Sequence, residues 1–276
     1  KREYVVQYEE SDLNFVSRWL EHEGISYYFV HEDEGEKVVF ADSNAGFAPL
    51  LGGPGAKYRP KQLQSAGSDW FGEETVHQLT ARHHVIQKKV MLKDYNYRKP
   101  ALDLKGEKDV HDKGWGTHYE GANHYKDPAE GTALADIRAQ ELKCREREFL
   151  GESYLWALRA GNTFSLEEHY RQDFDQEYLV TEMSIQAEQV IMLDRPGPPQ
   201  ASLEARFTAI PTKGCEFRPR RITPKPRVTG TITGKVDASG DGKYAEIDDM
   251  GRYKVSLPYD LSGRDISGDD GLTGAG

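Results

Sequence analysis

The first forty residues constrain the fold most, because strand, helix and turn signals follow one another there without interruption. Apolar and polar residues alternate over residues 4–8, which is the pattern of a strand. Ser11 or Asp12 then supplies a side-chain oxygen that can cap a helix, and Gly24 is suited to end it. We predict a helix between them. The residues expected on or beside its apolar face are Leu13, Val16, Leu20, Phe15 and Trp19.

A hairpin is predicted directly after this helix. Residues 25–30 are rich in β-forming side chains, residues 31–36 are polar and contain Gly35, and residues 37–41 return as a strand. The opening segment therefore reads as one amphipathic helix between a strand and a hairpin.

Further strands and one more helix are predicted along the rest of the chain. Residues 105–131 are polar and irregular, and we predict a helix over residues 132–149, capped by Thr132 and ended by Gly151. Pro219, Pro224 and Pro226 indicate a stiff linker. The predicted strands lie within residues 75–97, 154–158, 163–166, 178–185 and 227–234, with a last hairpin at 244–248 and 252–257.

Composition excludes several classes of protein. The net charge of −10 disfavours nonspecific binding to nucleic acid or to an anionic membrane, because phosphates repel such a surface. An Arg/Lys cluster, interpreted as a solvated or subunit-contacting linker, comprises Arg218, Arg220, Arg221, Lys225 and Arg227. Two cysteines provide no disulfide framework, and a reducing cytosol is the simpler compartment. The chain has no initiator Met, no signal peptide and no membrane-length apolar run, and we expect it to be an excerpt of a longer protein.

No catalytic motif is present, so the polar candidates are weighed singly. His83 and His84 are neighbours on a predicted strand and point to opposite faces, which prevents them from sharing a metal. Cys144 is expected to be an inert core thiol. A zinc site in the loop is not favoured, because the candidate ligands lack the usual spacing of zinc motifs. These candidates are His111, His118, His124 and Glu120.

One loop has the approximate spacing of a calcium site. Asp237, Ser239, Asp241 and Asp248 occupy positions one, three, five and twelve, with Gly242 at six. Ser at position three and the short Asp at position twelve weaken the match, and a hairpin turn rich in Asp and Gly explains the same residues. We therefore predict no metal site and no cofactor, with these four residues as the calcium candidates. Calorimetry without calcium heat at millimolar Ca²⁺ would exclude them.

Residues 4–29, YVVQYEESDLNFVSRWLEHEGISYYF, resemble the VgrG family, the spike proteins of bacterial type VI secretion systems, which are related to the hub of contractile phage tails. The segments AGNTFSL at 160–166 and YLVT at 178–181 also match the family pattern, as do residues 207–211 and 217–219. The resemblance covers nearly the whole chain, and it departs at Tyr253 and Tyr259.

The resemblance implies a mainly β fold with an α+β insert. It predicts small β-barrels like those of phage tail hubs, two helices, and then the start of an OB-type β-barrel. The predicted domains are an α+β hub subdomain at 1–70, a hub β-barrel subdomain with one helix at 71–218, and a linker with a partial OB-type barrel leading to a needle at 219–276.

The function implied by the resemblance is structural. We expect a homotrimeric, non-enzymatic puncturing tip that sits on a hexameric tail-tube protein and contacts baseplate proteins. A needle beyond this segment would carry the tip protein and effectors. Such a protein assembles in the bacterial cytoplasm and is then secreted or delivered into a target cell. The alternatives are the baseplate hub of a phage or phage-like tail, an effector enzyme carried only as a C-terminal extension, and an OB-type nucleic-acid-binding protein.

Overall fold

The computed structural model describes residues 5–53, 55–61, 74–190, 200–236 and 247–259. These residues fall into two compact units. The larger unit spans Trp19–Ile222, and the smaller combines the described parts of Lys1–Arg18 and Thr223–Gly276. Each unit is described by itself.

The larger unit contains a closed six-stranded β-barrel. Around the barrel the strands follow the order β11, β12, β9, β5, β4 and β10, and the pairing of β10 with β11 closes it. Strand β3 (Ala48–Pro49) adds a short parallel pairing to β10. The barrel strands are β4 (Gly55–Tyr58), β5 (Thr75–His83), β9 (Arg147–Ser153), β10 (Asn162–Glu167), β11 (Glu177–Val190) and β12 (Gln200–Pro211).

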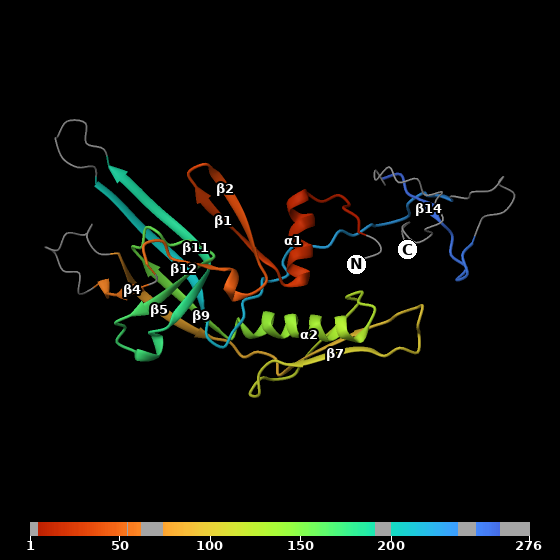
Figure 1. Cartoon of the computed structure of the whole chain (residues 1–276), viewed down its shortest axis with the longest axis horizontal. Helices are drawn as coiled ribbons and strands as arrows, with labels where there is room; N and C mark the ends of the chain where they lie inside the picture. Colours follow the sequence, from red (N-terminus) through yellow and green to blue (C-terminus); the bar gives the residue numbers. More distant parts are fainter. Residues whose placement is uncertain (1–4, 54, 62–73, 191–199, 237–246, 260–276) are drawn as a thin grey trace. The chain divides into compact units, whose positions relative to one another are not determined.

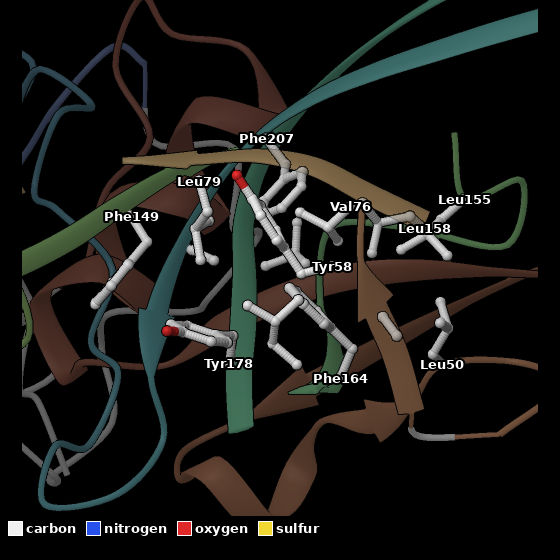
Figure 2. Close-up of a cluster of buried hydrophobic side chains, with 14 of the residues drawn as sticks. Leu50, Tyr58, Val76, Leu79, Phe149, Leu155, Leu158, Phe164, Tyr178 and Phe207 are labelled. Carbon is white, nitrogen blue, oxygen red and sulfur yellow. The ribbon is translucent and has the colours of Figure 1, made fainter. Parts of the chain in front are cut away.

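The barrel is filled by aromatic and aliphatic side chains (Figure 2). The rings of Phe149 and Tyr178 meet edge to face at 4.8 Å, and Phe164 stacks on Tyr178 at 5.6 Å. These three side chains are fully buried. Alternation within β9 directs Phe149, Gly151 and Ser153 inward, since these residues are buried while their neighbours are partly exposed. The barrel therefore has a packed core rather than a ligand cavity at this level.

Between the barrel strands β5 and β9, the chain forms a three-stranded sheet and a helix. Strands β6 (Lys89–Asp94), β7 (Leu104–Asp109) and β8 (Thr117–Gly121) form a three-stranded sheet in the order β7-β6-β8. Helix α2 (Pro128–Lys143) packs along it, and Figure 1 shows the helix beside β7. Their shared apolar core comprises Val90, Leu92, Leu104, Tyr125, Leu134, Ala135 and Ala139.

Helix α1 (Asp12–Glu23) and the hairpin of β1 (Ser26–Glu32) and β2 (Gly35–Ala41) confirm the helix and the hairpin predicted for the opening segment. The amide of Asn14 donates to Ser11 Oγ at 3.2 Å, so Ser11 caps α1. Gly24 has φ +73°, and the Ile25 amide reaches back to the Leu20 carbonyl at 2.8 Å, which is the expected C-terminal motif. Two residues of the expected apolar face, Leu13 and Val16, are 62% and 44% exposed.

The smaller unit contains one two-stranded pairing among its described residues, between β13 (Lys235–Val236) and β14 (Val255–Ser256). An isolated bridge joins Ile247 to Tyr253. The rings of Tyr8 and Tyr259 meet at 5.3 Å. The OB-type barrel stays a prediction for this region.

Three predicted strands are absent from the described residues of the structure. Residues 5–8 are not a strand: the Val6 carbonyl accepts from Arg18 Nη2 at 2.9 Å instead of a neighbouring strand. Residues 154–158 form a turn rather than a strand, and residues 227–234 are irregular, with pairing to β14 beginning at Lys235.

The boundaries of α2 were also predicted wrongly. Asp127, not Thr132, is the N-cap, because its side chain accepts from the Glu130 amide at 2.9 Å. The Glu130 carboxylate accepts a hydrogen bond from the Lys126 amide, and Pro128 occupies the first helical position. The helix ends at Lys143, which leaves residue 149 to the barrel. The region 105–131 was expected to be irregular and contains parts of β7 and β8.

Two short 3-10 turns are also described, η1 (Asn44–Gly46) and η3 (Gln172–Phe174). Neither described α-helix combines the length and the apolar character that a membrane crossing requires.

Candidate functional site

Three of the four calcium candidates, Asp237, Ser239 and Asp241, lie outside the described residues, and the calcium hypothesis stays untested for them. Asp248 is described, and both of its carboxylate oxygens are engaged within a turn. Oδ1 accepts from the amides of Met250 at 2.9 Å and Arg252 at 2.8 Å, and Oδ2 accepts from Arg252 Nε at 2.5 Å. Asp248 thus stabilises the turn at residues 249–251, whereas the hairpin-turn interpretation of residues 237–242 falls outside the described residues.

The loop histidines separate into different pairs. His111 Nε2 lies 3.1 Å from a carboxylate oxygen of Glu146, and His118 Nε2 lies 3.3 Å from Glu120. The amide of His124 donates to Asp94 Oδ2 at 2.5 Å. In the described part of the chain these histidines do not form a metal-binding group; the one group there with converging ligand atoms is His77, Glu152 and Glu204. His84, the residue after β5, lies 3.2 Å from Glu148.

Cys144 is buried, as expected for a core residue, and caps the end of α2. A hydrogen bond from the Cys215 thiol and the neighbouring charge of Arg145 lower the pKa of Cys144 to about 7, against the effect of burial. The same contact raises the pKa of Cys215. Both thiols are free, and they pack with Leu179 and Ile210 rather than facing a cleft.

The first arginines of the predicted linker are not solvated, which corrects that interpretation for Arg218 and Arg221. Arg218 donates through Nε to Gln140 Oε1 at 2.7 Å, and through Nη1 to the carbonyls of Gly24 at 3.0 Å and Asp42 at 2.5 Å. These two carbonyls stand at the two ends of the β1–β2 hairpin. Arg218 therefore ties the base of the hairpin to helix α2.

Arg138, which lies on α2, and Arg221 form a second arginine network. Arg221 donates to Glu120 at 2.6 Å and to Glu141 at 3.1 Å. Arg138 is 1% exposed, donates to the carbonyl of His22 at 2.5 Å and lies 3.2 Å from Glu141. Two arginines and two carboxylates thus neutralise one another and connect α2 to the end of α1.

Acid is expected to weaken the protein through Glu120. Burial opposes its ionisation, but the hydrogen bond and charge of Arg221, with His118 and Arg138, hold the pKa of Glu120 at about 2, below the ordinary 4.5. A pKa that is lower in the folded chain contributes stability above about pH 4.5, and this stability is lost as the pH falls toward 2. We expect Glu120→Gln to show a shallower loss of unfolding free energy over this range, measured by urea unfolding at successive pH values. Glu34→Gln, in the exposed hairpin turn, should keep the wild-type slope.

The candidate functional surface is one face of the β1–β2 hairpin. Tyr27 is paired with Phe40, and Phe29 with Val38, so these four side chains share a face. Phe29, Val38 and Phe40 are 51%, 44% and 55% exposed. The Tyr27 ring contacts Phe29 at 6.1 Å and Phe40 at 6.4 Å, which preorganises the patch. We call these four residues the apolar hairpin face. Such a cluster of exposed apolar side chains is characteristic of a docking surface.

The opposite face of the hairpin anchors it to the rest of the larger unit. Tyr28 donates to the Gly46 carbonyl at 2.9 Å, and its ring contacts Phe47 at 5.7 Å. A Cβ at Gly161 would lie 2.6 Å from the same ring. Among the described strands, β1 and β2 pair with each other and with no third strand. The hairpin is thus held in place while one apolar face stays available.

Sequence reasoning predicted both strands but missed their exposed face. The available signal was that apolar residues occupy both alternating sets, Tyr27, Phe29, Val38 and Phe40 on one side and Tyr28, Val30 and Val39 on the other. A hairpin with one protein-facing and one water-facing side needs only one apolar set.

Comparison with known proteins places this geometry in a family. The family model described as phage tail baseplate hub (GPD) matches residues 1–191. The chain is 29% identical over 265 residues to a Vibrio cholerae protein named actin cross-linking toxin VgrG1, covering 94% of this chain and 23% of that protein. It is 30% identical over 284 residues to the type VI secretion system spike protein VgrG5 of Pseudomonas aeruginosa, covering 95% of this chain and 34% of that protein. The chain thus spans about a quarter to a third of the length of these relatives.

The fold is shared with a solved structure. The E. coli c3393 protein, described as a component of the type VI secretion system with structural similarity to the T4 bacteriophage tail proteins gp27 and gp5, superposes with a TM-score of 0.56 at 22% identity. The match covers 92% of this chain and 51% of that one. The mainly β fold with a closed six-stranded barrel confirms the predicted fold class.

Proposed function

Because this chain belongs to the phage tail baseplate hub (GPD) family, we propose that it is the hub segment of a type VI secretion spike protein that acts mechanically and performs no catalysis. The observation that carries the proposal is the apolar hairpin face, on which Phe29, Val38 and Phe40 stay about half exposed while Tyr28 anchors the opposite face. An enzyme needs converging reactive groups in a cleft, whereas a hub needs surfaces for sister copies.

We propose a homotrimer in which the apolar hairpin face of each copy packs against a neighbouring copy. Burial of Phe29, Val38 and Phe40 would remove about half of each side chain's surface from water, a driving force of about 25 cal/mol per Å² of apolar area. The two arginine networks support this arrangement, since Arg218 fixes both ends of the hairpin before any partner binds.

The further partners follow the same proposal. The trimer would sit on a hexameric tail-tube protein and contact baseplate proteins, and residues 219–276 would lead through an OB-type barrel to a needle that carries the tip protein and effectors. Assembly would take place in the bacterial cytoplasm, followed by secretion or delivery into the target cell. The names of the relatives in Vibrio cholerae and Pseudomonas aeruginosa support the secretion particle over a phage tail.

The trimer is tested by light scattering during size-exclusion chromatography. We expect the chain at about 100 µM to show a mass near 94 kDa, three times the 31.2 kDa of one chain. Phe29→Asp with Phe40→Asp should give a folded monomer, because charges on the apolar hairpin face oppose burial while these half-exposed side chains contribute little to the core.

The matched control is Lys37→Asp, which places a carboxylate on β2 at an exposed polar position of the opposite face. This control should keep the mass of three chains. A wild-type monomer at this concentration would contradict the trimer, and a trimeric Phe29/Phe40 double variant would contradict the role of this face.

A further inference from the structure

An irregularity in the barrel brings a histidine to the side of two carboxylates. Strand β5 pairs with β9 through Val76↔Ser153 and Gln78↔Glu152, so His77 is an extra residue without a cross-strand partner. Thr75, Val76 and His77 are buried in succession, which regular alternation does not produce. Bulges of this kind redirect a side chain and are frequent beside functional sites.

Strand β9 lies between β5 and β12, and this order brings three ligand groups together. Glu152 on β9 is paired with Arg206 on β12. Glu204 lies two residues before Arg206 on β12, so its side chain is on the same face of the sheet as that of Glu152. The His77 Nε2 atom lies 3.5 Å from Glu152 Oε2 and 3.7 Å from Glu204 Oε1. All three ligand atoms lie within 4.8 Å of one another.

The histidine itself is buried and under-satisfied. Its side chain has no exposed surface, and neither ring nitrogen has a hydrogen-bond partner of good geometry. The ring stacks on Tyr154 with centroids 4.4 Å apart, which fixes its orientation. An unpaired buried nitrogen costs free energy, and a ligand bond would recover it.

We propose that His77, Glu152 and Glu204 form a binding site for a divalent transition-metal ion of the Zn²⁺ type. In a tetrahedral site with ligand bonds of about 2.0–2.2 Å, ligand atoms stand about 3.3–3.6 Å apart, close to the distances from Nε2 to the two carboxylates. The imidazole ligand selects Zn²⁺-like ions over Ca²⁺ and Mg²⁺, which prefer oxygen alone. Three protein ligands leave one coordination position for water or a partner group.

Lys61 is the competitor for this site. Its Nζ lies 2.6 Å from Glu204 Oε1 and 3.6 Å from Glu152 Oε2, so it neutralises the same carboxylates that the ion would use. The Lys61 side chain is 47% exposed and can move into solvent when an ion binds. Removal of this ammonium should therefore tighten metal binding, whereas a purely structural Glu–Lys–Glu network predicts only a loss of stability.

The test is titration of the 276-residue chain with Zn²⁺ against a fluorescent zinc chelator, with Co²⁺ absorption as the second readout. We expect one equivalent to bind and to give the visible bands of tetrahedral Co²⁺. Glu204→Gln should weaken binding at least tenfold, and Lys61→Met should strengthen it several-fold. Both substitutions are at partly exposed side chains, so a folded protein is expected and circular dichroism verifies it.

The matched controls are Glu107→Gln and Lys105→Met, which alter another carboxylate–lysine pair on β7 and should leave the affinity unchanged. Other histidine–carboxylate pairs provide weak surface binding, so the variants decide the outcome. Absence of stoichiometric Zn²⁺ binding would overturn the proposal. An affinity that Glu204→Gln leaves intact would identify adventitious surface binding and would overturn it equally.

Discussion

Gly106→Ala is expected to lower the free energy of unfolding by about 3 kcal/mol, although alanine is the better strand former. Gly106 lies on β7 directly beneath α2, and an added Cβ would stand 2.2 Å from the Gly131 carbonyl oxygen and 2.6 Å from its carbon. Both are backbone atoms of α2, so no side-chain rotation relieves the clash. The helix must move away from the sheet, which opens the core around Leu92, Leu104 and Leu134.

The measurement is urea unfolding followed by circular dichroism, with Gly121→Ala as the matched control. Gly121 lies on β8 of the same sheet, and its added Cβ would meet only the Lys93 carbonyl at 3.4 Å. We expect the control to change stability by less than about 0.5 kcal/mol. Equal effects of the two substitutions would show that α2 does not rest on β7 as closely as the structure has it.

Elements specified by local signals could be predicted from the sequence, whereas contacts between distant segments could not. The segment from Ser11 to Ala41 was predicted well because its signals are local: a capping serine, a glycine at the helix end and a polar turn between two apolar runs. The cap at Asp127 is equally local, because Pro128 and Glu130 stand in the positions expected after an N-cap. The prediction of Thr132 as the cap missed this local signal.

Closure of the barrel was not readable in the same way. Strand β4 pairs in parallel with β5 and with β10, which is more than one hundred residues away in the chain, and β10 then pairs with β11. No periodicity within one strand specifies such neighbours. The resemblance to a family implied the barrel, whereas residue patterns alone predicted only its strands β5, β10 and β11 and assigned the start of β9 to a helix.

The candidate sites show the same difference between local signals and contacts of distant segments. His77, Glu152 and Glu204 belong to three strands, and their convergence depends on a bulge and on strand order rather than on a spacing motif. The loop histidines, which are close in sequence, pair with different carboxylates in space. Proximity in the chain was therefore a poor guide to ligand geometry in this β protein.

Arg138→Met is the second large effect, with an expected loss of about 3–5 kcal/mol in the free energy of unfolding. The substitution keeps an unbranched side chain in the same space but removes the donor to the His22 carbonyl and the charge beside Glu141. Glu120 and Glu141 then share Arg221 as their arginine partner, which leaves one uncompensated negative charge in a region from which water is largely excluded.

Arg171→Met is the control for loss of an arginine, because its ion pair with Asp173 is more than half exposed and should contribute less than about 1 kcal/mol. Arg138→Lys separates charge from geometry: an ammonium restores the charge, but it cannot donate in the two fixed directions of the guanidinium fork, so an intermediate loss is expected. If Arg138→Met instead matches the Arg171 control, burial of this arginine contributes nothing to holding α1 against α2. In that case other contacts, including those of Arg218 and Tyr28, position the hairpin and the surface it presents.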